Sequence, residues 1–162
     1  LDLLAAAEAG RELHGRIVLA SLERVTPLLV SPAGELQVAM QLGRDPGGTY
    51  RLSGSIRGNL ILQCQRCLEE LPWPLDVEFR LGLVRSQEAA ERLAHGYEPL
   101  LVTAEPACIA DIVSDEVLLA LPFAPVHEDP DECHGMYKDY QPSCDVQREN
   151  PFAVLAGLKQ KQ

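Results

Sequence analysis

The sequence predicts an α+β domain built on an antiparallel, meander-like sheet, and three observations lead to this prediction. Apolar residues or glycines occupy every second position over 36–42, 52–64 and 71–83, the pattern of strands with one buried face. Turn-forming residues separate the first two stretches, since RDPGGTY occupies 44–50. A later stretch, 109–121, has apolar residues at helical spacing and ends at a proline. One or two helices are therefore expected to cover the sheet.

The first expected element is a short helix over 3–12. Ala, Leu and Glu dominate this stretch, and Gly10 weakens only its end. The next element is a strand, because Leu36, Val38, Met40 and Leu42 alternate with polar or small neighbours.

A long hairpin is expected to follow, with a C-x2-C motif near its turn. Its first strand carries Gly54 and Gly58 on the apolar face, and such glycines indicate bulges or bends. Its second strand, 71–83, has charged residues on the opposite face, so one side of the sheet should face water. Cys64 and Cys67 lie between the two strands.

The second half of the chain adds helices and one short strand. Residues 85–94 are rich in Glu, Ala, Gln and Arg and predict a helix, and 97–103 predict a strand. The helix over 107–121 begins after Pro106 and ends at Pro122, and we expect it to cover one face of the sheet.

A change of composition after Val126 divides the chain into two parts. Residues 1–126 are expected to form the α+β core domain. Residues 127–162 are expected to form an acidic, loop-rich arm and a short C-terminal helix, packed on or tethered to the core. Asn150 is the expected cap of that last helix, with Pro151 in its first turn.

The charge balance and the cysteine count limit the class of protein. The chain has 162 residues, with 14 Lys and Arg against 24 Asp and Glu, so its net charge of -10 disfavours a purely electrostatic grip on phosphate. No apolar run approaches the ~20 residues that span a bilayer, and no basic segment precedes the first apolar residues. A cytoplasmic protein without membrane contact is expected. Five cysteines are too few for a disulfide-dense scaffold, so reduced thiols are expected.

The C-x2-C motif is typical of half a zinc site, because its spacing lets two thiolates reach one tetrahedral ion from a tight turn. Zinc normally needs four ligands, and the remaining candidates lie in the acidic arm. Cys133 is the expected third ligand, and the fourth stays open among three residues. The expected metal site is therefore Cys64, Cys67, Cys133 and His127, with His134 or Cys144 as alternatives to the histidine. A degenerate site with simple buried thiols is equally open.

The alternative function is that of a thiol-disulfide oxidoreductase using Cys64 and Cys67. Thioredoxin-type pairs lie at a helix N-terminus, where the helix dipole lowers the thiol pKa. Here Pro72 and Pro74 argue against a long helix after the motif. No hydrolase, phosphate-binding or dinucleotide motif occurs, so a protein that is not an enzyme is expected.

Three other features have structural interpretations. Cys108 has no spaced partner and is expected to be a small buried hydrophobe. Trp73 alternates with two leucines, which favours core packing over base stacking. If RNA is contacted, the hairpin face is the expected surface, because it carries the arginines of the central region, namely Arg57, Arg66, Arg80 and Arg85.

Four stretches together resemble the YceD family of bacterial proteins. They are LQCQRCLEEL at 62–71, YEPL starting at 97, DEVLLALPFAPVHED at 115–129 and NPFAVLAGLK at 150–159. The resemblance implies a role in accumulation of large-subunit ribosomal RNA, through synthesis, processing or stability of 23S rRNA, with no enzymatic activity.

The resemblance also bears on the site and the partners. Cys64 and Cys67 fall on the family's C-x2-C, and Cys133 falls where many members carry further cysteines. A ribosomal protein or an rRNA-processing factor is the implied partner. Because ribosomal proteins are generally basic, the acidic segment 127–149 is expected to bind such a partner.

Overall fold

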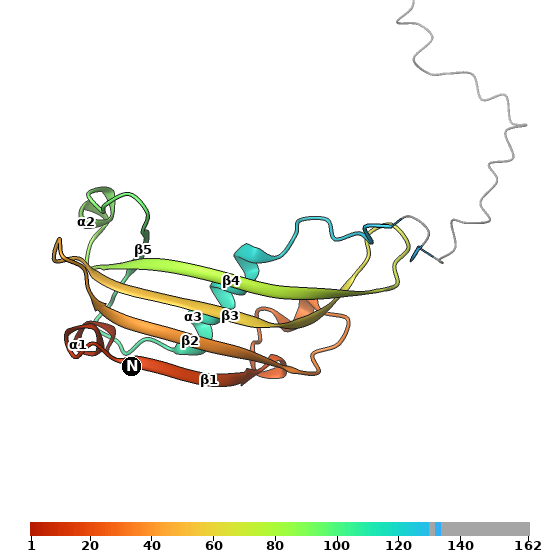
Figure 1. Cartoon of the computed structure of the whole chain (residues 1–162), viewed down its shortest axis with the longest axis horizontal. Coiled ribbons are helices and arrows are strands. Elements are labelled where there is room, and N and C mark those ends of the chain that lie inside the picture. Colours follow the sequence, from red (N-terminus) through yellow and green to blue (C-terminus); the bar gives the residue numbers. More distant parts are fainter. Residues whose placement is uncertain (130–131, 134–162) are drawn as a thin grey trace, which may run out of the picture.

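A computed structural model describes residues 1–129 and 132–133. Its centre is one five-stranded sheet in the order β1-β2-β3-β4-β5, and the first four strands form an antiparallel meander (Figure 1). The fifth strand pairs with β4 in the parallel sense. The predicted α+β class with a meander-like sheet is confirmed. The strands are β1 Glu12–Val18, β2 Glu35–Arg44, β3 Tyr50–Gln63, β4 Glu70–Val84 and β5 Glu98–Leu101.

Helices connect and cover the sheet. α1 (Leu3–Glu8) precedes β1, and α2 (Gln87–Glu91) lies in the connection that makes β5 parallel to β4. α3 (Ile109–Ala120) crosses one face of the sheet, as predicted (Figure 1). Two short 3-10 turns, Leu19–Ser21 and Thr26–Leu28, join β1 to β2. Among the described residues, no helix is long and apolar enough to cross a membrane.

The core lies between α1, α3 and the apolar face of the sheet. Val113 and Val117 of α3 are fully buried, and Phe79 of β4 is buried with them in one cluster. Trp73 is partly buried and packs against this cluster, as expected for a core residue. The opposite face of the sheet carries charged pairs, including Arg57 Nε with Asp76 Oδ1 at 2.9 Å. The sheet therefore has the one wet face that the alternation predicted.

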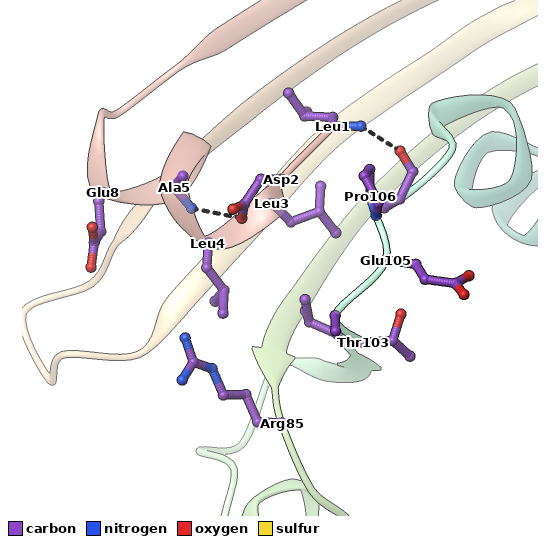
Figure 2. A pocket seen from close by; sticks show the side chains of 13 residues that line it. Leu1, Asp2, Leu3, Leu4, Ala5, Glu8, Arg85, Thr103, Glu105 and Pro106 are labelled. Atoms are coloured by element: carbon purple, nitrogen blue, oxygen red, sulfur yellow. Dashed lines mark hydrogen bonds between the residues drawn. The ribbon is translucent and has the colours of Figure 1, made fainter.

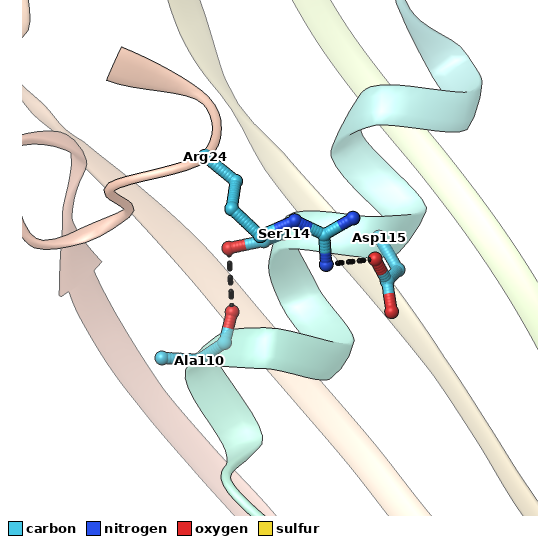
Figure 3. Close-up of polar contacts among 4 residues, drawn as sticks. All are labelled: Arg24, Ala110, Ser114 and Asp115. Carbon is cyan, nitrogen blue, oxygen red and sulfur yellow. Dashed lines mark hydrogen bonds and ion pairs between the residues drawn. The ribbon is translucent and has the colours of Figure 1, made fainter.

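A surface ion pair joins α3 to the connection between the two 3-10 turns. Arg24 pairs with Asp115, and Ser114 donates to the carbonyl oxygen of Ala110 one turn earlier at 2.7 Å (Figure 3). Leu22 and Val25 on either side of Arg24 are buried. Because both charged side chains are more than half exposed, burial of these two neighbours contributes more to the docking than the ion pair does.

The prediction of one helix over 3–12 is wrong in its second half. α1 ends at Glu8, and Gly10 has a φ of +63°, a left-handed conformation that ends a helix. β1 then starts at Glu12 and pairs with β2. The strand was missed because Leu13 and Ile17 are only partly buried, so its apolar alternation is weak.

The predicted bulges at Gly54 and Gly58 are absent. Pairing of β3 with β4 runs through both glycines, and pairing of β3 with β2 runs through Gly54, without a change of register. A Cβ on Gly54 would lie 2.6 Å from the Ala39 carbonyl oxygen and 2.6 Å from Phe79 Cζ. A Cβ on Gly58 would lie 2.6 Å from Leu36 Cδ2. Both positions therefore need glycine because neighbouring atoms approach the backbone closely.

Candidate metal centre

The tip of the β3–β4 hairpin is a tight turn that directs two thiols inward. The Cys64 N–H donates to the Glu69 carbonyl at 2.9 Å, and the Leu68 N–H donates to the Cys64 carbonyl at 2.9 Å. Leu68 has a φ of +65°, so the chain reverses through a left-handed residue. Cys64 and Cys67 are both buried, at 0% and 8% exposure. The spacing of two residues between the cysteines thus places both sulfurs on the inside of the turn.

The chain returns to this turn after α3. The Gln65 N–H donates to the Pro125 carbonyl at 2.8 Å, which holds the segment after α3 against the hairpin tip. His127 is buried at 9% exposure, and its Nε2 lies 3.2 Å from the Glu70 carbonyl oxygen. Because a carbonyl only accepts, Nε2 must carry the ring proton, and the lone pair on Nδ1 faces the thiols.

Four side chains from the two segments meet at one point. The ligand atoms of Cys64, Cys67, His127 and Cys133 all lie within 4.8 Å of one another. The Cys64 and Cys133 sulfurs are 3.9 Å apart, and His127 Nδ1 is 3.5 Å from the sulfurs of both Cys67 and Cys133. A tetrahedral zinc ion with Zn–S bonds of ~2.3 Å and a Zn–N bond of ~2.0 Å requires ~3.8 Å between sulfurs and ~3.5 Å from nitrogen to sulfur. The donor set and its spacing therefore fit a tetrahedral zinc ion.

The two cysteines of the turn have opposite pKa shifts. Burial raises the pKa of Cys64, but backbone hydrogen bonds from Cys67, His127 and Arg66 outweigh it and lower the pKa to about 5. Burial raises the pKa of Cys67 to about 11, and the neighbouring sulfurs of Cys64 and Cys133 add to the rise. Backbone amides that favour a thiolate at Cys64 are the environment that a metal-ligating cysteine needs.

Arg66 was not predicted to have any part in this site. Its Nε donates to Cys133 Sγ at 3.0 Å, and its terminal nitrogen Nη2 donates to the carbonyl oxygens of His127 at 3.1 Å and Asp129 at 3.4 Å. The sequence offered one signal, namely its place between the two cysteines of the motif. The contacts themselves join positions more than sixty residues apart.

The structure brings together the four residues that were expected to form the site. The alternative ligands His134 and Cys144, the acidic segment beyond residue 133 and the expected C-terminal helix lie outside the described residues. The expectation that Cys108 is buried is wrong. Cys108 is exposed because it is the N-cap of α3, at the start of the helix rather than on its inner face.

A separate cavity lies at α1, away from the cysteine cluster. It has a volume of about 550 Å³ and lies between α1 and the segment 102–107 (Figure 2). The Leu1 nitrogen donates to the Ala107 carbonyl at 2.8 Å across it, and Glu8 and Arg85 supply charges of both signs. Among the described residues, the lining of this cavity contains no histidine or cysteine.

These features define a class of protein: a small α+β domain whose hairpin tip and returning arm converge on a cluster of three cysteines and one histidine. The sequence model of a family described as "Large ribosomal RNA subunit accumulation protein YceD" matches residues 52–159. The chain is also 32% identical over 145 residues to the protein of that name from Haemophilus influenzae, covering 86% of this chain and 83% of that protein. The chain belongs to the YceD family, which confirms the resemblance. No solved structure matches it.

Proposed function

We propose that this protein is a non-enzymatic factor that supports synthesis, processing or stability of 23S rRNA in the large ribosomal subunit. The observation that carries the proposal is the family match over 52–159, which includes the hairpin, α3 and all four residues of the cysteine-histidine cluster. The name of the Haemophilus influenzae relative describes accumulation of large-subunit ribosomal RNA. A cytoplasmic location follows from this role.

The second part of the proposal is that Cys64, Cys67, His127 and Cys133 hold one structural zinc ion. The agreement between the observed spacing and that of a tetrahedral Cys3His site supports it. When bound, zinc would supply a cross-link between the hairpin tip and the arm. The chain's own groups prepare the site, since the Glu70 carbonyl fixes the His127 ring and backbone amides favour the Cys64 thiolate.

The geometry favours this role over that of a thiol-disulfide oxidoreductase. A redox pair needs an accessible thiolate, usually at a helix N-terminus. Cys64 and Cys67 are buried, they lie in a hairpin turn, and two further ligand-type side chains crowd them. Four convergent donors are what a structural metal site requires and are more than a dithiol catalyst uses.

The proposed partner is a basic ribosomal protein or an rRNA-processing factor that contacts the acidic arm. Glu128 and Glu132 lie between His127 and Cys133 in the sequence and are exposed, so they add negative charge close to the cysteine-histidine cluster. Such charge attracts a basic protein and repels phosphate, which favours a protein partner over direct RNA contact at this end of the molecule.

Depletion of the protein in its own host tests the first part. We expect the ratio of 23S to 16S rRNA and the amount of large subunits to fall, whereas an unchanged ratio in depleted cells would contradict the proposal.

The partner is tested by pulldown at moderate salt with Glu128 and Glu132 changed to Gln. Glu91→Gln with Glu105→Gln is the matched control, because both control carboxylates are exposed near α2 and β5. Equal recovery of basic partners by both variants would contradict the proposal that the acidic residues near the cluster bind the partner.

A further inference from the structure

Arg66 spans the two segments that form the cluster. It lies in the turn between Cys64 and Cys67, and its side chain reaches across to the returning arm. There it donates to the Cys133 sulfur at 3.0 Å and to the carbonyl oxygens of His127 and Asp129 at 3.1 and 3.4 Å. One planar guanidinium group therefore contacts the third cysteine and the backbone of the histidine. The rigid fork of donors in arginine makes such a three-way contact possible.

The charge of the site gives this contact a specific role. Three thiolates and one neutral imidazole around a divalent zinc ion leave about one net negative charge. The guanidinium of Arg66 supplies one positive charge beside it. Arginine keeps its charge at all physiological pH values, so the guanidinium group stays positively charged next to the sulfur of Cys133.

Cys133 is the position where this charge matters most. Cys64, Cys67 and His127 are buried, whereas Cys133 is only partly buried. Water and competing chelators therefore reach the metal first on the Cys133 side. A bond from Arg66 to that sulfur lowers its electron density and holds its position, and the bond to the His127 carbonyl ties the histidine to the hairpin tip.

We propose that Arg66 is the positioning residue that sets how slowly the cluster releases its metal ion, by fixing Cys133 and holding residues 127–129 against the hairpin tip. This inference rests on the zinc site proposed above. Lysine in its place keeps the charge but not the planar fork, so it cannot contact the sulfur and both carbonyls together. We therefore expect Arg66→Lys to retain the metal ion less well than the unmodified protein, although the positive charge is kept.

The test measures zinc transfer from the zinc-loaded full chain to a colorimetric chelator, after zinc per chain has been counted. We expect Arg66→Gln to release zinc roughly 10-fold to 100-fold faster than the unmodified protein, with Arg66→Lys between the two. Arg57→Gln is the matched control, because Arg57 pairs with Asp76 on the outer face of the sheet. It should release zinc at the unmodified rate.

A cobalt-substituted sample separates positioning from general destabilisation. Loss of the N–H···S bond should shift the sulfur-to-cobalt charge-transfer band in Arg66→Gln and leave it unchanged in Arg57→Gln. Zinc bound normally but released from both Arg66 variants at the unmodified rate would overturn this inference and leave the zinc site intact. Absence of metal in the unmodified chain would overturn the zinc site itself. If Arg66→Gln does not fold, the release rate of Arg66→Lys decides the question by the same criterion.

Discussion

Replacement of Cys133 by serine is expected to remove the proposed metal cross-link between this residue and the β3–β4 hairpin tip, and so to lower the thermal stability. Cys133 lies 69 positions beyond Cys64. A cross-link that closes a loop of this length removes chain entropy worth about 4 kcal/mol from the unfolded state. This value applies where the unfolded chain also holds the metal, and zinc that binds only the folded chain adds to it. At roughly 3 °C per kcal/mol for a domain of this size, Tm should fall by about 12 °C or more.

The assay is thermal unfolding followed by circular dichroism, with and without a chelator. Chelation of the unmodified protein should lower its Tm to that of Cys133→Ser, and Cys133→Ser itself should not respond to chelation. Cys108→Ser is the control, because this thiol is exposed at the start of α3 and should behave as the unmodified chain does. A Cys133→Ser protein that keeps one zinc per chain and the unmodified Tm would refute the reasoning.

Three further substitutions test the packing, the turn and a buried carboxylate. Gly54→Ala should destabilise the fold by about 1–3 kcal/mol in urea unfolding, because its methyl group would contact a carbonyl and an aromatic ring, whereas Gly15→Ala, with open space around it, should be nearly neutral. Leu68→Gly should raise the free energy of unfolding by about 1 kcal/mol, since glycine adopts the left-handed φ without strain, and a loss would contradict this. Burial, then the charges of Glu98 and Asp115, raises the pKa of Glu116 above its ordinary value of 4.5. The native state therefore keeps this proton where the unfolded chain has lost it, and stability falls as pH rises above about 4.5. Glu116→Gln should thus stabilise the protein at pH 7 and make little difference at pH 4; equal effects at both values would sink the explanation.

Much of the sheet could be predicted because its alternation is strong. The strand predicted over 71–83 lies within β4, and the helix predicted over 107–121 extends beyond α3 by two residues at its start and one at its end. β1 escaped prediction because it is an edge strand whose apolar residues are half buried. The glycines of β3 were misinterpreted because close approach of Phe79 and of a β2 carbonyl depends on pairing between strands, which local sequence does not reveal.

For the candidate site, the sequence allowed the candidate ligands to be named from their residue types and spacing. The spacing of Cys64 and Cys67 indicated half a metal site, and the acidic segment offered Cys133 as the third ligand. The sequence left the fourth ligand open among His127, His134 and Cys144. What the sequence could not provide was the contact of Arg66 with the arm. This contact forms where the chain after α3 returns to the hairpin, beside the Gln65–Pro125 backbone hydrogen bond, and local sequence does not reveal that return.

The central claim is that the protein needs its cysteine-histidine cluster in order to support accumulation of 23S rRNA. The most direct test is the 23S to 16S rRNA ratio in host cells whose own copy is replaced by Cys67→Ser or by Cys108→Ser at equal protein level. Cys67 belongs to the cluster and Cys108 does not. We predict a normal ratio with Cys108→Ser and a lowered ratio with Cys67→Ser. A normal ratio with both variants would contradict the claim, because the rRNA function would then be independent of the cysteine-histidine cluster.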